Sequence, residues 1–174
     1  MQGLKGKNAL ITGASSGIGQ AIAIRLAQEG VNIAINYRKS PEGAEETEAQ
    51  AMQKACGDVE SCGVKSLLVQ GDVSQEDDIV QMVNAVVQEF GSLDILINNA
   101  GIQTECASHE VATDDFDQII SVNLRGAYLC ARETLKHLLS QNRQGVIINI
   151  SSVHENSSGE IRLTTTTTTM RSNE

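Results

Sequence analysis

The sequence predicts a doubly wound α/β fold, in which helices cover both faces of a parallel sheet. Short apolar runs alternate along the chain with longer amphipathic segments, which is the pattern that right-handed β–α–β crossovers produce. A glycine-rich turn joins the first apolar run to the first amphipathic segment. At 174 residues the chain fits one domain and can bury a core.

The first five elements follow from apolar runs, helical spacing, and glycine and proline stops. The first helix carries Ile18, Ile22 and Leu26 on one face and ends at Gly30, and Pro41 opens the second helix. The predicted elements are a strand at 8–12, a helix over 17–30, a strand at 31–37, a helix at 42–55 and a strand at 64–70.

The second half of the chain continues the alternation. Ser74 opens the segment S-Q-E-D, which predicts a capping box in which Asp77 reaches back to the start of the helix. The run at 93–98 is apolar on both faces, as a parallel strand covered on both sides must be. The predicted elements are a helix from 74 with Ile79, Val83, Val86 and Phe90 in its stripe, a strand at 93–98, a helix from 113 to about 142 with Phe116, Ile120, Leu124, Ala127, Ala131, Leu135 and Leu138 near one face, and a strand at 145–150.

Composition excludes several classes of partner. The net charge of −9 repels phosphate backbones and anionic lipid headgroups, so we expect neither nucleic acid nor a membrane surface as a partner. No window approaches the roughly 20 apolar residues of a membrane span, and we expect a cytoplasmic protein. The cysteines and histidines show no metal-site spacing, so no metal is predicted; they are Cys56, Cys62, Cys106, Cys130, His109, His137 and His154.

The turn after the first strand, T-G-A-S-S-G-I-G, has the composition of a phosphate-binding turn. Gly13, Gly17 and Gly19 let the backbone turn sharply and approach a pyrophosphate, and the following helix offers unpaired amides and about half a positive charge. Three glycines alone also fit an ordinary connection. The flanking strand and helix favour nucleotide binding.

The end of the second strand bears on the choice of nucleotide. An acidic residue there would bind the ribose of NAD, whereas an arginine accommodates the additional phosphate of NADP. This chain has Tyr37, Arg38 and Lys39, and no carboxylate before Glu42. NADP is therefore favoured, or tolerance of both nucleotides; the alternative is that Arg38 and Lys39 are only solvated loop charges.

Five motifs occur in an order and spacing that resemble the short-chain dehydrogenase/reductase family, whose sheet is Rossmann-like. The resemblance covers residues 1 to about 155, and the sequence at 149–155, NISSVHE, is similar to that of bacterial glucose 1-dehydrogenases. The motifs are TGASSGIG (12–19), GDVS (71–74), NNAG (98–101), SVNLRG (121–126) and INISS (148–152).

The resemblance implies a role for each matching residue. Asn123 would interrupt the long helix and hold a water in a proton relay, and Ser152 would hydrogen-bond the substrate. Taken singly, Asp72 also fits a turn residue and Asn123 a solvent-facing one. The cofactor contacts would be Gly13, Ser15, Ser16, Gly17, Ile18 and Gly19 at the diphosphate, Tyr37 and Arg38 at the end of the second strand, Asp72 and Val73 at the adenine, and Asn99, Ala100 and Gly101 along the ribose.

One family motif is missing from the sequence. The family places Tyr-x-x-x-Lys so that its tyrosine follows the serine by thirteen positions, and positions 165 and 169 hold threonine here. The only tyrosines are Tyr37 and Tyr128, and the last lysine is Lys136. Because losing a positioned acid/base costs about 10² to 10⁴ in rate, we expect little or no turnover from this chain.

Residues 156–174 are predicted to be a low-complexity, disordered tail after the domain at 1–155. They contain only Ile161, Leu163 and Met170 as large apolar residues, too few to offset the entropy of ordering. A short edge strand in the threonine run is the alternative. The abrupt loss of motifs suggests a coding frame or gene end altered after about residue 155, which would leave the edge of the strand at 145–150 unpaired.

Two functions are compatible with the sequence. The first is an NAD(P)-dependent oxidoreductase that moves hydride between the nicotinamide and a secondary alcohol such as a sugar. The second is a non-catalytic nucleotide-binding or oligomer-interaction protein that pairs through the helix at 113–142. A methyltransferase with a similar sheet is disfavoured, because no ribose-binding acid follows the second strand.

Overall fold

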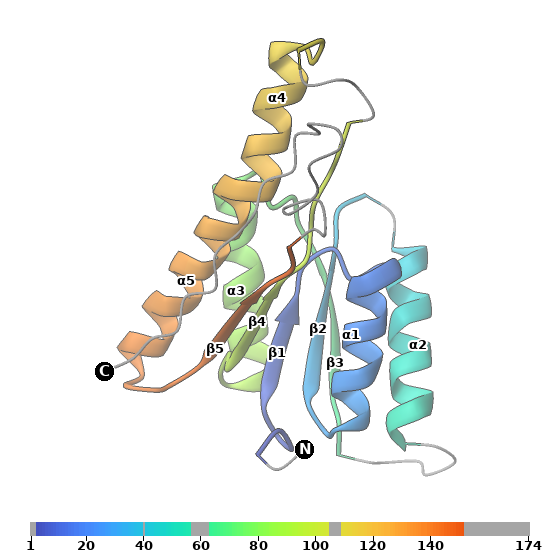
Figure 1. The fold of residues 1–174 in the computed structure, drawn as a ribbon. Coiled ribbons are helices and arrows are strands. Elements are labelled where there is room, and N and C mark those ends of the chain that lie inside the picture. Colours follow the sequence, from blue (N-terminus) through green and yellow to red (C-terminus); the bar gives the residue numbers. More distant parts are fainter. Residues whose placement is uncertain (1–2, 40, 57–62, 105–108, 152–174) are drawn as a thin grey trace.

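The structure of the chain is a computed structural model that describes residues 3–39, 41–56, 63–104 and 109–151. Its centre is a parallel sheet with the strand order β3-β2-β1-β4-β5 (Figure 1), which confirms the predicted doubly wound fold. The strands are β1 (Asn8–Ile11), β2 (Asn32–Tyr37), β3 (Ser66–Gln70), β4 (Ile95–Asn98) and β5 (Val146–Asn149). The helices are α1 (Gly17–Gln28), α2 (Glu42–Cys56), α3 (Glu76–Phe90), α4 (Thr113–Ile120), η1 (Ser121–Gly126) and α5 (Ala127–Ser140).

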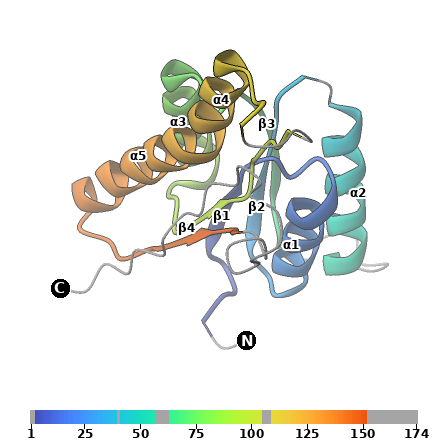
Figure 2. The same cartoon turned by 45° about the horizontal axis from the view of Figure 1, so that its top comes forward.

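Helices cover both faces of the sheet. In Figures 1 and 2, α1 and α2 lie on one face and α3 and α5 on the other. Successive residues of β1 point to opposite faces, so Leu10 packs in the core under α3 and α5, while Ala9 and Ile11 pack in the core under α1 and α2. All three are fully buried, which explains why the strand reads as a continuous apolar run.

The strand order creates a switch point at the carboxyl ends of β1 and β4. From β1 the sheet extends through β2 to β3 on one side and through β4 to β5 on the other. The helices that follow β1 and β4 lie on opposite faces, and in open α/β sheets ligands bind where this happens. The turn after β1 and the residues after β4 therefore meet at the edge where a ligand is expected.

A polar network closes the opposite, amino-terminal edge. The buried Asp94 carboxylate accepts hydrogen bonds from the Asn8 amide (3.0 Å) and from the Arg143 guanidinium (2.7 Å). The Asn8 side chain accepts one from Asn32 (2.8 Å) and donates one to Ser92 (2.9 Å). These bonds satisfy the buried carboxylate and link β1 to β2 and to the segment before β4.

The predicted capping box at the start of α3 is wrong. The N-cap of α3 is Gln75 and no side chain caps it. Ser74 instead donates its amide to the Asp72 carboxylate (2.9 Å), and the Asp78 carboxylate accepts from the Asp72 amide (2.8 Å). The free amides of this turn are thus satisfied by Asp72 and Asp78, not by Ser74 and Asp77.

The helix predicted over 113–142 runs from α4 through a π-helical turn, η1, into α5. Its predicted core face is partly wrong: Phe116 and Leu124 are 40% and 45% exposed, whereas Ile119 and Val122 are buried. A uniform 3.6-residue spacing does not hold across a π turn. In addition, α4 extends past the end of the sheet (Figure 1), so part of its surface has no layer to cover.

Some predictions fall outside the described residues. These are the placement of Ser152, the disordered tail at 156–174, and the threonines at 165 and 169. Among the helices that the structure describes, none has the length and apolar content to cross a bilayer. Within the same residues, no three His, Cys, Asp or Glu side chains gather as metal ligands would.

Candidate functional site

The turn after β1 packs directly against the residues that follow β4. Gly13 has φ +61°, in the left-handed region that glycine adopts without steric cost. A Cβ at this position would lie 2.9 Å from the Ala100 Cα. Both the backbone conformation and the space around it therefore require glycine.

Asn36, a buried residue of β2, holds the turn from one side. Its Oδ1 accepts a hydrogen bond from the Gly13 amide (3.0 Å), and its backbone carbonyl accepts one from the Ala14 amide (2.9 Å). Its Nδ2 donates to the Gly71 carbonyl (3.0 Å), just after β3. One side chain thus ties the turn after β1 to the turn after β3. Its role was not predicted from the sequence, although it stands out there as a polar side chain inside an otherwise apolar strand.

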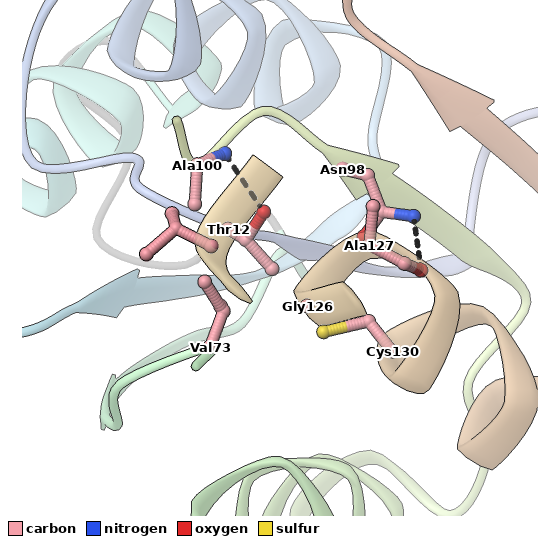
Figure 3. Close-up of a pocket in the computed structure, with 8 residues that line it drawn as sticks. Thr12, Val73, Asn98, Ala100, Gly126, Ala127 and Cys130 are labelled. Carbon is pink, nitrogen blue, oxygen red and sulfur yellow. Dashed lines mark hydrogen bonds between the residues drawn. The ribbon is translucent and has the colours of Figure 1, made fainter. Parts of the chain in front are cut away.

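Asn99 and Thr12 hold the turn from the other side. The Asn99 Nδ2 donates to the carbonyls of Thr12 (2.9 Å) and Gly13 (3.0 Å). The Thr12 hydroxyl accepts from the amides of Asn99 and Ala100, both at 3.0 Å; the second bond is drawn in Figure 3. A Cβ at Gly19 would come within 2.5 Å of the Asn99 Nδ2, so this glycine permits the contact.

The amino terminus of α1 follows the turn and lacks a side-chain cap. Its N-cap, Ser16, is extended and its hydroxyl makes no capping bond. The Gln20 amide donates to the Ser16 carbonyl (3.2 Å), so the amides of the first turn before it have no partner within the helix. Ser16, Gly17 and Ile18 are exposed, which also places Ile18 outside the buried face of α1. These are the features of an anion-binding helix end.

A cationic side chain lies at the end of β2. The Arg38 Nη1 is 3.9 Å from the Asp72 Oδ2, and the Arg38 side chain is 43% exposed. Lys39 is exposed as well. Tyr37, in contrast, packs against the core under α1 and α2. The structure thus brings Arg38 and Asp72 together at the carboxyl edge and leaves the Arg38 guanidinium accessible to a ligand.

The loop after β3 is supported by η1. The Arg125 Nη1 donates to the Ser74 carbonyl (3.0 Å). Val73 is buried, and a Cβ at Gly126 would come within 2.7 Å of its carbonyl oxygen. Asp72 and Val73 therefore occupy a loop whose position depends on η1 as well as on β3.

Asn123 lies in η1, where the helix changes to π-helical bonding. Its Oδ1 accepts from the Ile102 amide (2.9 Å) and its Nδ2 donates to the Ile102 carbonyl (2.8 Å). These bonds link η1 to the segment that follows Gly101. Both ends of the side chain thus bond to Ile102, and a water held at this residue would donate its hydrogen bond to the backbone carbonyl.

A small hollow separates the ends of β1 and β4 from η1 and α5 (Figure 3). It leaves essentially no room for even one water molecule, whereas ligand pockets measure roughly 300–1,000 Å³. The Asn98 Nδ2 is paired with the Ala127 carbonyl (3.1 Å). The hollow is therefore a packing gap beneath the site and not a pocket that could bind a dinucleotide. Its lining is Thr12, Val73, Asn98, Ala100, Val122, Gly126, Ala127 and Cys130.

The thiol of Cys130 at this hollow is not a nucleophile. Burial raises the pKa of Cys130 to about 12. The thiol is therefore protonated at neutral pH, and the thiolate that would react is absent.

The structure gathers four predicted segments at one edge of the sheet: the turn after β1, the end of β2, the loop after β3 and the residues after β4. Ser151, at the end of the described chain, is exposed, and Ser152 lies outside it. Like Asn36, Thr47 of α2 was not predicted; its hydroxyl is 3.0 Å from the Ala14 carbonyl.

Comparison with known proteins agrees with this geometry. A family model described as short chain dehydrogenase matches residues 7–163. Glucose 1-dehydrogenase 2 of Bacillus subtilis is 39% identical over 153 residues, which cover 87% of this chain and 56% of that protein. The 3-oxoacyl-(acyl-carrier-protein) reductase FabG of Staphylococcus aureus is 42% identical over 147 residues, or 84% of this chain and 56% of that protein.

Solved structures show the same likeness. The crystal structure of levodione reductase superimposes with a TM-score of 0.80 and 32% identity, covering 90% of this chain and 58% of that one. A putative short-chain alcohol dehydrogenase from Sinorhizobium meliloti gives a TM-score of 0.79 at 33% identity. The chain spans just over half the length of the curated relatives it matches, 56% in both cases. On the family match and these identities, the chain belongs to the short-chain dehydrogenase family.

Proposed function

We infer that this chain binds a nicotinamide dinucleotide, NADP or NAD, across the carboxyl edge of its sheet. The reaction for which the family site is built is hydride transfer to or from a secondary alcohol. The observation that carries the proposal is the turn after β1. Its carbonyls and amides at Thr12, Gly13 and Ala14 are bonded to the protein, and the uncapped helix end behind them is exposed. A diphosphate is the part of a dinucleotide that such a helix end binds.

The described residues fit such a ligand. Side chains at Gly13 and Gly19 would occupy the space in which the turn and the start of α1 contact Ala100 and Asn99, the residues after β4. In this proposal Ser15, Ser16, Gly17 and Ile18 meet the diphosphate, Asp72 and Val73 the adenine, and Asn99, Ala100 and Gly101 the ribose.

Arg38 is the basis for preferring NADP. Its guanidinium is accessible and its carboxylate neighbour, Asp72, is 3.9 Å away, a separation that leaves room for a stronger, bidentate contact with a phosphate. Tyr37 packs into the core, so it would form part of the wall at this end of the site and would add no charge.

When bound, the nicotinamide would supply the chemistry of accepting or donating a hydride. Asn123 would hold a water through its backbone carbonyl, and Ser152 would hydrogen-bond the oxygen of the substrate. A sugar substrate is suggested by the name of the Bacillus subtilis relative. The 174 residues contain only two tyrosines, Tyr37 and Tyr128, and threonine stands at positions 165 and 169. We therefore expect the 174-residue polypeptide to bind the cofactor and to turn over little or no substrate.

Two measurements on the purified polypeptide test this proposal. Titration of NADPH, followed by its fluorescence, should saturate, whereas a folded chain that does not bind it would contradict the proposed site. Addition of NADP and glucose should give no reduced cofactor above the background absorbance. A normal dehydrogenase rate would contradict the expected inactivity while leaving the binding proposal intact.

A second candidate role is self-association through the α4–η1–α5 surface. Phe116, Leu124, Tyr128 and Leu139, all within α4, η1 and α5, are 40%, 45%, 60% and 78% exposed, and exposed large apolar side chains are typical of interfaces when they form a continuous patch. Light scattering should show an oligomer of the chain that Tyr128→Glu dissociates. A monomer at micromolar concentration would favour the nucleotide-binding role alone.

A further inference from the structure

Helix α2 contacts the turn after β1 through two small residues. The Thr47 hydroxyl, fully buried, lies 3.0 Å from the Ala14 carbonyl and 2.8 Å from the Gly43 carbonyl. It also accepts a hydrogen bond from the Gln20 Nε2 of α1 (3.1 Å). One hydroxyl therefore joins α1, α2 and the turn.

Gly43 makes the approach of α2 possible. A Cβ at this position would lie 2.5 Å from the Ser15 carbonyl oxygen and 3.4 Å from the Ser15 Cβ. Any side chain here would have to displace either α2 or the backbone of the turn. The carbonyls of Ala14 and Ser15, which lead into the amino terminus of α1, are thus both positioned by α2.

The contact with α2 completes the fixation of the turn. Asn36 of β2 holds the amides of Gly13 and Ala14, and Asn99 holds the Gly13 carbonyl. Only Thr47 holds the Ala14 carbonyl among the bonds that the structure gives it. Losing this hydroxyl would leave the buried Ala14 carbonyl and the Gln20 side-chain amide without their shared partner, and the turn would relax to satisfy them.

We propose that Thr47 and Gly43 are positioning residues for cofactor binding: they fix the Ala14 and Ser15 carbonyls and thereby the direction of the free amides at the start of α1. The inference rests on the proposed nucleotide site and extends it to α2, which itself touches no part of the ligand through these residues. Because the diphosphate is common to NAD and NADP, the two residues set affinity for both and have no part in discriminating between them.

The test compares buried threonines in two helices. Thr47→Val removes the hydroxyl and keeps the shape, whereas Thr47→Ser restores it. Thr134→Val is the matched control, because Thr134 is also fully buried and its hydroxyl donates only within α5, to the Cys130 carbonyl (2.8 Å). Titrations with NADPH and NADH give the dissociation constants, and far-UV circular dichroism verifies that each variant is folded.

We expect Thr47→Val to weaken both nucleotides by a similar factor, about five- to tenfold, in line with the loss of one buried hydrogen bond. Thr47→Ser and Thr134→Val should stay within about twofold of the parent chain. Gly43→Ala, which raises the helix propensity of α2, should weaken binding at least as much as Thr47→Val while circular dichroism is retained; it decides the matter if Thr47→Val does not fold.

Three results would overturn the inference. Unchanged affinity in both Gly43→Ala and a folded Thr47→Val would show that α2 does not shape the turn. An equal loss in Thr134→Val would reveal a general effect of destabilisation. Weakening of NADPH without NADH would assign the effect to the end of β2. A folded parent chain that binds neither nucleotide would overturn the proposed function itself, a result visible before any variant is made.

Discussion

The side-chain amide of Asn99 donates a hydrogen bond to the Gly13 carbonyl at 3.0 Å, across the 86 residues that separate them in sequence. The same nitrogen reaches the Thr12 carbonyl at 2.9 Å. The residue after β4 therefore sets the shape of the turn after β1, and neither segment makes the site alone.

Replacing this donor by an acceptor should damage both the fold and the site. In Asn99→Asp a carboxylate would face two carbonyls, and we expect the free energy of unfolding to fall by about 1–3 kcal/mol. Urea denaturation measures this loss, and NADPH affinity should fall as well. Asn84→Asp on the exposed face of α3 is the control and should leave both quantities nearly unchanged. Equal stability of the two variants would contradict the role of Asn99.

Arg38→Ala tests the preference between nucleotides. Removing the guanidinium should weaken NADPH about tenfold, because hydrogen bonds to charged groups are stronger than neutral ones. Binding of NADH should stay within about twofold, since NADH lacks the additional ribose phosphate of NADPH. Lys65→Ala, which removes an exposed cation next to the amino end of β3, controls for net charge. An equal loss for both nucleotides would assign Arg38 to the fold or to a shared part of the ligand.

Adjacent isoleucines of β5 should differ in their contribution to stability. Ile147 is 9% exposed and packs in the core under α3 and α5, whereas Ile148 is 41% exposed on the opposite face. Ile147→Ala should lower the free energy of unfolding by about 2–4 kcal/mol and Ile148→Ala by less than about 1 kcal/mol. Chemical denaturation of the 174-residue chain measures both. Similar losses would mean that the outer face of β5 is covered in solution.

The buried thiol of Cys130 should resist alkylation and should impose a pH dependence at high pH. Burial raises its pKa from an ordinary 9.0 to about 12, so the unfolded chain loses this proton first. The contribution of this thiol to the free energy of unfolding is therefore fully present below pH 9 and is lost as the pH rises towards 12. Mass spectrometry after iodoacetamide treatment at pH 8 should find Cys130 unmodified in the folded chain and modified in denaturant. Cys130→Ala should reduce the slope of stability above pH 9.

Much of the fold could be predicted from local pattern. β1, β4 and the centre of β2 are buried on both faces, so their residues read as continuous apolar runs, and the glycine-rich turn indicates the start of α1. The turn before α3 could not be predicted this way, because its hydrogen bonds do not follow the capping pattern. The Asp78 carboxylate accepts a hydrogen bond from the Asp72 amide. This bond shapes the turn for which the sequence spacing predicted a cap at Ser74.

The site shows the same division. The predicted Gly13, Arg38, Asp72 and Asn99 do converge at one edge, because parallel strands deliver their carboxyl ends together. The residues that hold this arrangement were not predicted. Asn36 forms hydrogen bonds to the turns that follow β1 and β3. Such partners are determined by the packing of the sheet and not by neighbours in the sequence.

The central position of β1 has a kinetic consequence. Its pairing with β2 joins residues about two dozen positions apart, such as Asn8 and Asn32, whereas its pairing with β4 joins Ala9 to Ile95. Closing the longer loop is slower, because more chain entropy must be lost before the contact forms. During refolding, helical signal should therefore return before nucleotide affinity, since the binding edge is complete only when β4 has docked beside β1.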